Sequence, residues 1–436
     1  MKGWVGCGLP ALYYDIAMAV LPSSLIPPIE RLPDRPAGNE DLPYFLNRFR
    51  TKAGVEVLSP NCLYCHGGRI NGALVPGLGN ADGYFQIFGP EAIPIAKALQ
   101  WLSWLYVWSP ARRTEMGKVG DRMAAVAPYI SVPVAGSNPT HNLAWALVVH
   151  RDPQTLAWSD APNFSLPPVD APPSDVPPWW RMRKKHAMFA AAGGQGDHTG
   201  FMSVNSALCV DTVEDYDAFY DYFDDLYAYV RSIQPPPYPH PVDSQLGAAG
   251  KGVFTAHCRG CHGTYGAREE DETYPNRVIP LEKIGTDPEL ARYNRETSKA
   301  ASDWLNLSVY TRHGHYAPYD GYVAPPLDGI WATAPFLHNG SVPTLAALMD
   351  STTRPRFWTR QRGDTDTYND SHDYDWQAVG WQYQTLDHGQ ADERDATKRK
   401  HVVDTTLKGF SNAGHTYGDE LDADQRRALL EYLKTL

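Results

Sequence analysis

The amino-acid sequence predicts a mainly α-helical protein built as two similar halves, with long loop-rich insertions and little β-structure. Three observations predict this fold class. The pentapeptide pattern C-x-x-C-H occurs twice, in two distant parts of the chain. Each copy is followed, after a long middle segment, by an amphipathic helix that ends its half. Finally, 37 prolines and an aromatic content of 12% indicate loops packed around large, flat groups.

Both pentapeptides have the composition of a c-type haem attachment site. The residues are Cys62, Cys65 and His66 in the first copy, and Cys258, Cys261 and His262 in the second. In such sites the two thiols form thioether bonds to the haem and the histidine is the proximal iron ligand. A redox Cys-x-x-Cys or a four-cysteine zinc site explains them less well, because the pairs lie far apart and the histidine recurs in both. The sequence therefore predicts two covalently bound haem c groups and two c-type cytochrome domains.

The order of these features predicts the domain organisation. We expect an N-terminal extension over residues 1–40, an N-terminal c-type haem domain over 41–233, a proline-rich linker over 234–242 and a C-terminal c-type haem domain over 243–436. The apolar stripe of residues 213–233 predicts a helix before the linker. A second helix over 423–436 closes the chain, with Asp422 and Gln425 as a capping pair. A third, over 96–108, is rich in tryptophan, and a fourth leads from Gly250 into Cys258.

Charge and cysteine usage limit the partners and the compartment. The net charge of −11 argues against a nucleic-acid partner and favours a basic redox partner protein. Covalent haem attachment takes place outside the cytoplasm, so we expect a periplasmic or secreted protein, although residues 1–28 do not form a clean signal peptide. That compartment permits a Cys7–Cys209 disulfide, the alternative being two buried thiols. No apolar run is long enough to predict a membrane span.

The sixth iron ligands decide the function, because a haem with one open face can bind oxygen or peroxide whereas a haem with two ligands carries electrons. For the second haem, His415 lies between glycines just before the last helix and is predicted to be the ligand. For the first haem, residues 180–203 leave the choice open. The ligand candidates are His186, Met188, His198 and Met202, and an open face covered by Phe189 is the further alternative.

Four basic residues precede these candidates. Arg181, Arg183, Lys184 and Lys185 either pair with haem propionates or form a solvated basic turn. His313 and His315 lack acidic or cysteine partners at ligand spacing, so a metal site there is not expected. His338 is expected to brace a haem through a hydrogen bond rather than to bind iron.

Several segments together resemble the di-haem cytochrome c peroxidase superfamily, and most of all its rubber oxygenase branch. The segments are residues 183–189 (RKKHAMF), 284–288 (IGTDP), 321–331 (GYVAPPLDGIW), 334–340 (APFLHNG) and 414–415 (GH). The resemblance covers roughly residues 55 to 436. The chain is shorter than rubber oxygenases, and His186 stands beside the expected active face, so cleavage of polyisoprene does not follow from the resemblance.

The resemblance implies a division of labour between the haems. The N-terminal haem would hold dioxygen beside a phenylalanine, here Phe189, in the wall formed by residues 184–189. The C-terminal haem, capped by His415, would handle electrons. Trp331 would lie near the haems as packing or as an electron relay, and some peroxidase relatives hold a calcium ion between the haems.

The sequence therefore predicts an exported di-haem c-type oxidoreductase in which the N-terminal haem binds and activates dioxygen or peroxide and the C-terminal bis-histidine haem relays electrons. Catalytic roles fall on Phe189, Trp331 and His186, the last as a proton donor to the oxygen–oxygen bond. The substrate would be a small or hydrophobic organic molecule, or peroxide. The alternative is an electron-transfer cytochrome in which both haems are six-coordinate.

Overall fold

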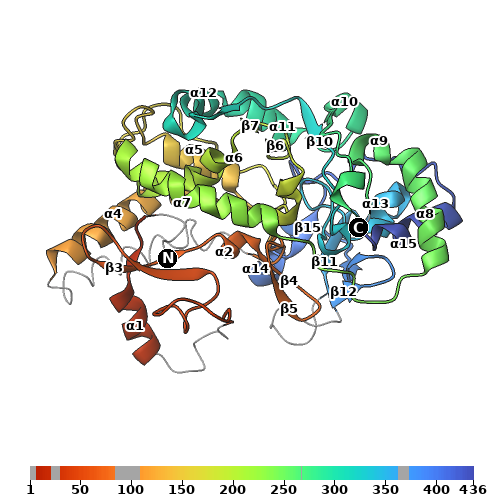
Figure 1. The fold of residues 1–436 in the computed structure, drawn as a ribbon, viewed down its shortest axis with the longest axis horizontal. Helices are drawn as coiled ribbons and strands as arrows, with labels where there is room; N and C mark the ends of the chain where they lie inside the picture. The colour runs from red at the N-terminus through yellow and green to blue at the C-terminus, as the bar shows by residue number, and fades with distance from the viewer. Residues whose placement is uncertain (1–5, 21–29, 84–108, 267, 362–372) are drawn as a thin grey trace.

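Helices and short strands alternate along the chain, joined by long loops (Figure 1). This computed structural model describes residues 6–20, 30–83, 109–266, 268–361 and 373–436. The helices in the first half are α1 (Ala11–Val20), α2 (Leu63–His66), α4 (Pro110–Val126), α5 (Thr140–Val148), α6 (His198–Ser203) and α7 (Val213–Ser232). Those in the second half are α8 (Ser244–His257), α9 (Arg259–His262), α10 (Leu281–Ile284), α11 (Glu289–Arg292), α12 (Lys299–Leu307), α13 (Leu345–Met349), α14 (Ala396–Arg399) and α15 (Ala423–Leu433).

Six small antiparallel sheets are spread through the described residues. Three are three-stranded: β1–β3–β2 (Leu9–Pro10, Glu56–Pro60, Leu46–Arg50), β6–β7–β9 (Ala187–Met188, Gly194–Gly196, Gly314–Tyr316) and β14–β11–β15 (Tyr383–Thr385, Phe357–Arg360, Val402–Asp404). Three are two-stranded: β4–β5 (Gly67–Ile70, Ala73–Pro76), β10–β8 (Gly321–Val323, Val278–Pro280) and β12–β13 (Tyr374–Asp375, Gly380–Trp381). The predicted fold class, mainly α with two c-type cytochrome domains and little β-structure, is therefore wrong.

The approach to the first motif shows the physical reason for this difference. Residues 56–60 (EVLSP) form β3, not a helix, and pair with β2 and β1, so that Val57 and Leu58 are buried between neighbouring segments. Val57, Leu58 and Ser59 are buried in succession, as in a strand covered on both faces, and Pro60 ends the strand. The segment before the first motif is thus held by pairing with strands elsewhere in the chain. A search of the sequence for helical periodicity does not detect such pairing.

Segments from the two predicted domains share one core and one sheet. Strand β9 of the second half pairs with β7 of the first, Gly194 opposite Tyr316. Trp304 of α12 and Tyr310 are buried among residues of α5 and α7 such as Leu147 and Phe223. Residues 299–316, which the sequence assigns to the C-terminal domain, thus pack and pair with segments assigned to the N-terminal domain. The domain boundaries stay a prediction.

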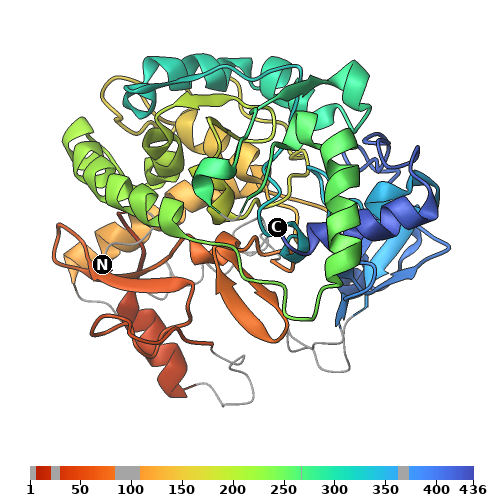
Figure 2. The same ribbon diagram turned by 45° about the vertical axis from the view of Figure 1, so that its right-hand side comes forward.

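Both helices predicted at the ends of the halves are present, and so is the helix before the second motif. α7 spans Val213–Ser232, and α15 spans Ala423–Leu433 with the predicted capping box of Asp422 and Gln425. α8 crosses α15 closely (Figure 2), with the rings of Phe254 and Tyr432 5.3 Å apart at the crossing. The tryptophan-rich helix predicted over 96–108 lies outside the described residues.

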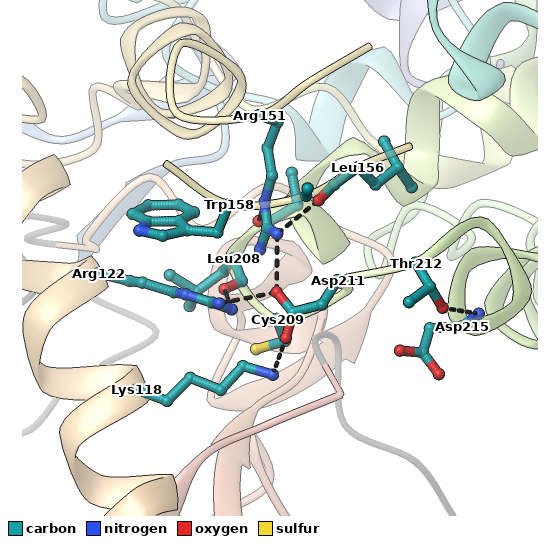
Figure 3. Close-up of polar contacts among 12 residues, drawn as sticks. Lys118, Arg122, Arg151, Leu156, Trp158, Leu208, Cys209, Asp211, Thr212 and Asp215 are labelled. Atoms are coloured by element: carbon teal, nitrogen blue, oxygen red, sulfur yellow. Dashed lines mark hydrogen bonds and ion pairs between the residues drawn. The ribbon is translucent and has the colours of Figure 1, made fainter. Parts of the chain in front are cut away.

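The N-terminal segment is fastened to the rest of the chain by a disulfide between Cys7 and Cys209, which confirms the predicted pairing. Both cysteines are buried. Beside it, Asp211 accepts hydrogen bonds from Lys118 (2.5 Å), Arg122 (2.7 Å) and Arg151 (2.8 Å) (Figure 3). These four residues, the Asp211 cluster, tie α4 and the end of α5 to the segment that carries the disulfide.

We expect Asp211→Asn to destabilise the protein by about 3 kcal/mol, because it leaves the fully buried Arg151 without its counter-charge. Burial raises the pKa of Asp211, but hydrogen bonds from Lys118 and Arg151 and the charge of Arg122 lower it further, to about 2. The folded pKa is thus below the unfolded one. The stabilisation by this carboxylate is complete above the ordinary aspartate pKa of 3.8 and is lost as the pH falls towards about 2.

Urea unfolding at neutral pH and at several pH values down to 2 measures both effects. Asp217→Asn is the matched control, because Asp217 forms an exposed ion pair with Arg312 (2.9 Å) and exposed pairs contribute at most about 1 kcal/mol. Equal losses of stability in the two variants would contradict the structural role of the cluster.

Candidate functional site: a shared cavity with two Cys-x-x-Cys-His motifs

The two motifs have the same local structure. Each folds as a single helical turn, α2 or α9, whose N-cap is the first cysteine. The histidine N–H donates to the carbonyl of that cysteine, at 2.9 Å for His66 and 3.0 Å for His262. Residues spaced three and four apart on a helix lie on one face. Each turn therefore presents two thiols and one imidazole to the same side, as attachment of one haem requires.

Both motifs line one large internal cavity of about 1020 Å³. This volume lies at the upper end of the range of about 300–1,000 Å³ that ligand pockets occupy. Its wall is mainly apolar and includes all six motif ligands, His415 and Phe189, and, from the N-terminal segment, Cys7 and Tyr13. The four motif cysteines are free thiols. Burial raises the pKa of Cys62 and Cys65 to about 12 and that of Cys258 to about 11.

The structure brings His415 next to His262, with ring centres 6.3 Å apart. Imidazole nitrogens bind a metal such as zinc at about 2.0–2.1 Å, and one ion shared by two facing imidazoles would put the ring centres at about this separation. Nδ1 of His262 lies 2.8 Å from the carbonyl of Pro325, and Nδ1 of His415 is buried. Nε2 is thus the nitrogen that each ring has available for the cavity.

His66 has different surroundings. Its ring packs against Trp179, with ring centres 5.0 Å apart and planes inclined by 31°. Nδ1 of His66 is buried without a hydrogen-bond partner in the described residues. Among the described residues, no second histidine ring lies against His66 in the way that the ring of His415 lies against His262. The two motifs therefore share their local fold but differ on the side that faces their histidine.

Burial keeps the three motif-associated histidines neutral. It lowers the pKa of His66 to about 4, and burial together with the nearby His262 lowers that of His415 to about 4. The pKa of His262 is also lowered, mainly by burial. Metals bind the neutral imidazole, so all three are in the ligand form at neutral pH.

The candidates for the sixth position of the first haem are placed differently from one another. Met188, His198 and Met202 line the cavity. His198 is buried, and its Nδ1 lies 3.1 Å from the hydroxyl of Tyr227 on α7. Phe189 also lines the cavity, and its ring lies 6.0 Å from His141 and 6.1 Å from both Phe201 and Tyr316. Phe189 has a left-handed backbone, φ 68°, a conformation that aims its ring out of the regular β6 alternation.

Two predicted catalytic residues lie outside the cavity wall. His186 is exposed, so a role as proton donor within the cavity has no support from its position. Trp331 is buried in the core of the second half, where its Nε1 donates to the carbonyl of Pro236 (3.2 Å) and its ring packs near Tyr238 and Trp376. Packing is thus the role that the surroundings of Trp331 support.

Sequence reasoning missed a pair of prolines that support the two motif histidines. Pro325 accepts a hydrogen bond from His262. The backbone of Pro177 lies near His66 and opposes the lowering of its pKa by burial, but His66 Nδ1 makes no hydrogen bond of the kind that His262 makes. Each of these prolines is the first of a Pro-Pro pair that follows an apolar residue. The same pattern also occurs at residues 26–28, 166–168 and 171–173, so the sequence alone does not single out these two prolines. His141, on α5, was also missed, and a lone histidine is not singled out either.

Arg354 positions the loop that carries His415. Its guanidinium donates to the carbonyls of Asn412 (2.6 Å), Gly414 (2.7 Å) and His415 (3.2 Å), and to those of Ala347 and Leu348 on α13. Gly414 adopts φ 73°, and a Cβ there would lie 2.2 Å from the backbone of Gly285. The glycine is needed because the loop touches a neighbouring backbone.

We expect Arg354→Lys to loosen His415, because an ammonium group cannot hold carbonyls on both α13 and the loop at once. The expected result is that carbon monoxide binds partially at the second haem of the reduced protein. Visible absorption spectroscopy measures this binding. Arg356→Lys is the matched control, since Arg356 is exposed and stacks on Phe357. Unchanged carbon monoxide binding in Arg354→Lys would show that the loop keeps His415 in place without Arg354.

The residues present fit haem c. The cavity is large and apolar, and each motif lines it with two thiols and one imidazole that burial keeps neutral. Among the described residues, no cluster of three or more His, Cys, Asp or Glu side chains is arranged to hold a metal ion, so the calcium ion stays a prediction. Within the same ranges, no helix is long and apolar enough to cross a membrane.

Comparison with known proteins leads in the same direction. A family model described as "RoxA-like, cytochrome c-like" matches residues 321–359, which include Pro325 and Arg354. The uncharacterized protein y4iJ of Sinorhizobium fredii (strain NBRC 101917 / NGR234) is 31% identical over 269 residues, 47% of this chain and 41% of that protein. The uncharacterized protein y4iM of the same organism is 28% identical over 239 residues, 48% of this chain and 52% of that protein.

The chain thus spans about half the length of these curated relatives. Their names assign no activity, and the family match covers a short part of the second half. The family match supports only a general assignment of this chain. The chain contains a cytochrome c-like region of a kind that carries haem c, and it is linked to the cytochrome c superfamily and to haem oxidoreductases.

Proposed function

We propose that the protein is an exported, periplasmic or secreted di-haem c-type oxidoreductase. In this proposal the haem on His66 binds and activates dioxygen or peroxide, and the haem between His262 and His415 relays electrons. The observation that carries the proposal is the asymmetry of the cavity. Two motifs of similar local fold face it, but His262 has a second histidine 6.3 Å away, whereas the described residues place no such histidine ring against His66.

In this proposal the apolar wall around Phe189 is the reactive face of the first haem. Phe189 and Phe201 line the cavity and pack with the ring of Tyr316 behind them, and burial raises the pKa of Tyr316 well above its usual value, so that its phenol stays neutral. When bound, haem supplies the iron chemistry with oxygen or peroxide. The protein's part is to orient an apolar substrate and to keep competing water away.

A short route through the protein joins the two motifs and supports the relay. Next to Trp179, which packs on His66, Trp180 donates through Nε1 to the carbonyl of Asp328 (2.8 Å). Three residues before Asp328, Pro325 accepts from His262. The route therefore consists of neighbouring residues, one indole hydrogen bond and one imidazole hydrogen bond, and its middle residues, Trp179, Trp180 and Asp328, are buried.

The proposal includes the substrate class and a redox partner. The apolar cavity favours a small or hydrophobic organic substrate alongside oxygen or peroxide, and the net charge of −11 favours a basic electron-transfer protein. A dioxygenase activity like that of rubber oxygenases and a peroxidase activity are both consistent with this site. The resemblance to the rubber oxygenase branch of the di-haem peroxidase superfamily favours the first.

Replacing Phe189 tests the proposal. We expect Phe189→Ala to change oxygen or carbon monoxide binding at the first haem, and turnover with oxygen or peroxide, while the second haem keeps its spectrum. Leu307→Ala is the control, because Leu307 is 63% exposed and truncating it removes a similar apolar volume from the surface. Unchanged ligand binding in Phe189→Ala would place the reactive face elsewhere.

An electron-transfer cytochrome is the second candidate, because Met188, His198 and Met202 line the same cavity and one of them can complete the first haem. In that case the wild-type protein binds no carbon monoxide when reduced. Replacing the actual ligand would then open the first haem, which Phe189→Ala would not do.

A further inference from the structure

The four basic residues before β6 are divided between two environments. Arg183 and Lys184 turn to an acidic pair: both lie 2.8 Å from Asp328, and Lys184 lies 2.6 Å from Glu272. Arg181 and Lys185 line the cavity instead. The middle two cations are thus neutralised by the protein, and the other two face the space that both motifs share.

Lys185 has no anionic partner among the described residues. Burial and the nearby charge of Arg181 lower the pKa of its ammonium group to about 8. Arg181 is 7% exposed, and its hydrogen bonds go to neutral acceptors, the hydroxyl of Thr333 (3.1 Å) and the carbonyl of Asp328 (3.4 Å). Both cations therefore lack a direct contact with a carboxylate.

The nearest acid in the wall does not complete them. Asp175 lines the cavity near Arg181, but burial raises the pKa of its carboxyl to about 8, so it is largely protonated at neutral pH. Arg181 is buried and Lys185 is half-buried. A buried charge without a partner is strongly unfavourable, and a bound anion would remove that cost. A carboxylate that enters the cavity would find two cations and a proton donor together.

We propose that Arg181 and Lys185 form a carboxylate-binding subsite in the wall of the apolar cavity. The proposal rests on the proposed haem-carrying function. The carboxylate comes from one of two sources, a haem propionate or the head group of an amphiphilic organic ligand whose chain lies along the apolar wall. Arginine holds a carboxylate through two parallel N–H groups, and lysine adds a point charge.

The test uses the intact holoprotein and the variant Lys185→Met, which keeps the length of the side chain and removes its charge. Lys185→Arg is the conservative variant that should preserve the effect. Lys408→Met is the control, because Lys408 is 80% exposed and pairs with Glu289 on the surface. Haem content is measured first: a protein without two haems would overturn the proposed function, whereas the outcomes below concern the subsite alone.

The first arm records reduced-minus-oxidised infrared spectra. A propionate held by Lys185 predicts shifted carboxylate bands and a lower midpoint potential of one haem in Lys185→Met. The second arm titrates the protein with dodecanoate and with dodecanol, followed by the haem absorption. A ligand head group held by Lys185 predicts a loss of about tenfold or more in affinity for the carboxylate, with dodecanol unchanged.

Either result supports the subsite and identifies its source. The proposal is overturned when Lys185→Met, with both haems attached, matches the wild type in its carboxylate bands and in its preference for dodecanoate over dodecanol. It is also overturned when Lys408→Met shows the same changes, because the effect would then be one of net charge.

Discussion

Replacing His415 by glycine is expected to open the second haem. The reduced variant should bind carbon monoxide at both haems, whereas the wild type binds it at one. The reason is geometric: His415 is the imidazole that lies 6.3 Å from His262 across the cavity, and its loop is fixed by Arg354. Added imidazole should restore the six-coordinate spectrum of the variant, because it enters the space left by the side chain.

An exposed histidine provides the control for this experiment. His388 lies on the surface beside Asp387 and Glu393, and His388→Gly should leave carbon monoxide binding unchanged. If His415→Gly carries both haems and still binds no more carbon monoxide than the wild type, another residue caps the second iron.

Replacing Gly250 by alanine is expected to cause a large loss of stability, although it adds only one methyl group. α8 and α15 approach so closely that a Cβ at Gly250 would lie 1.9 Å from the carbonyl oxygen of Ala428 and 2.9 Å from Tyr432. Since helix backbones cannot separate without disturbing the packing of Phe254, we expect destabilisation of about 3 kcal/mol or more. Thermal unfolding followed by circular dichroism measures it.

The same helix offers a matched comparison. Gly252, two residues further on, has open space where a Cβ would lie, with nothing within 4 Å, and alanine there should stabilise the helix by about 1 kcal/mol. Opposite signs for the two variants are the expected result. Similar effects of both substitutions would contradict the close crossing of α8 and α15.

The sequence predicts those parts of the fold that depend on local patterns. The apolar stripe of α7, the capping box of α15 and the helix before Cys258 are all set by residues within a few turns of one another. The Cys7–Cys209 disulfide was one of two alternatives left by counting cysteines, because four of the six were already assigned to the two motifs. Each of these is confirmed.

What the sequence could not predict depends on contacts between distant segments. The small sheets form because short extended stretches find partners far along the chain, as β7 and β9 do. His186 follows Lys185 directly, but it lies at a bend just before β6 and is exposed, and only Lys185 lines the cavity. No sequence pattern identifies Arg354, because its partners on the His415 loop are backbone carbonyls about 60 residues away.

The central claim is that one haem is open and the other is closed by His415. Titration of the dithionite-reduced wild-type protein with carbon monoxide, followed by visible absorption, tests it most directly. The account predicts that one of two haems per chain shifts its spectrum. A spectrum in which neither haem shifts would contradict the account and establish a six-coordinate electron carrier. A shift of both would show that His415 is not a firm ligand.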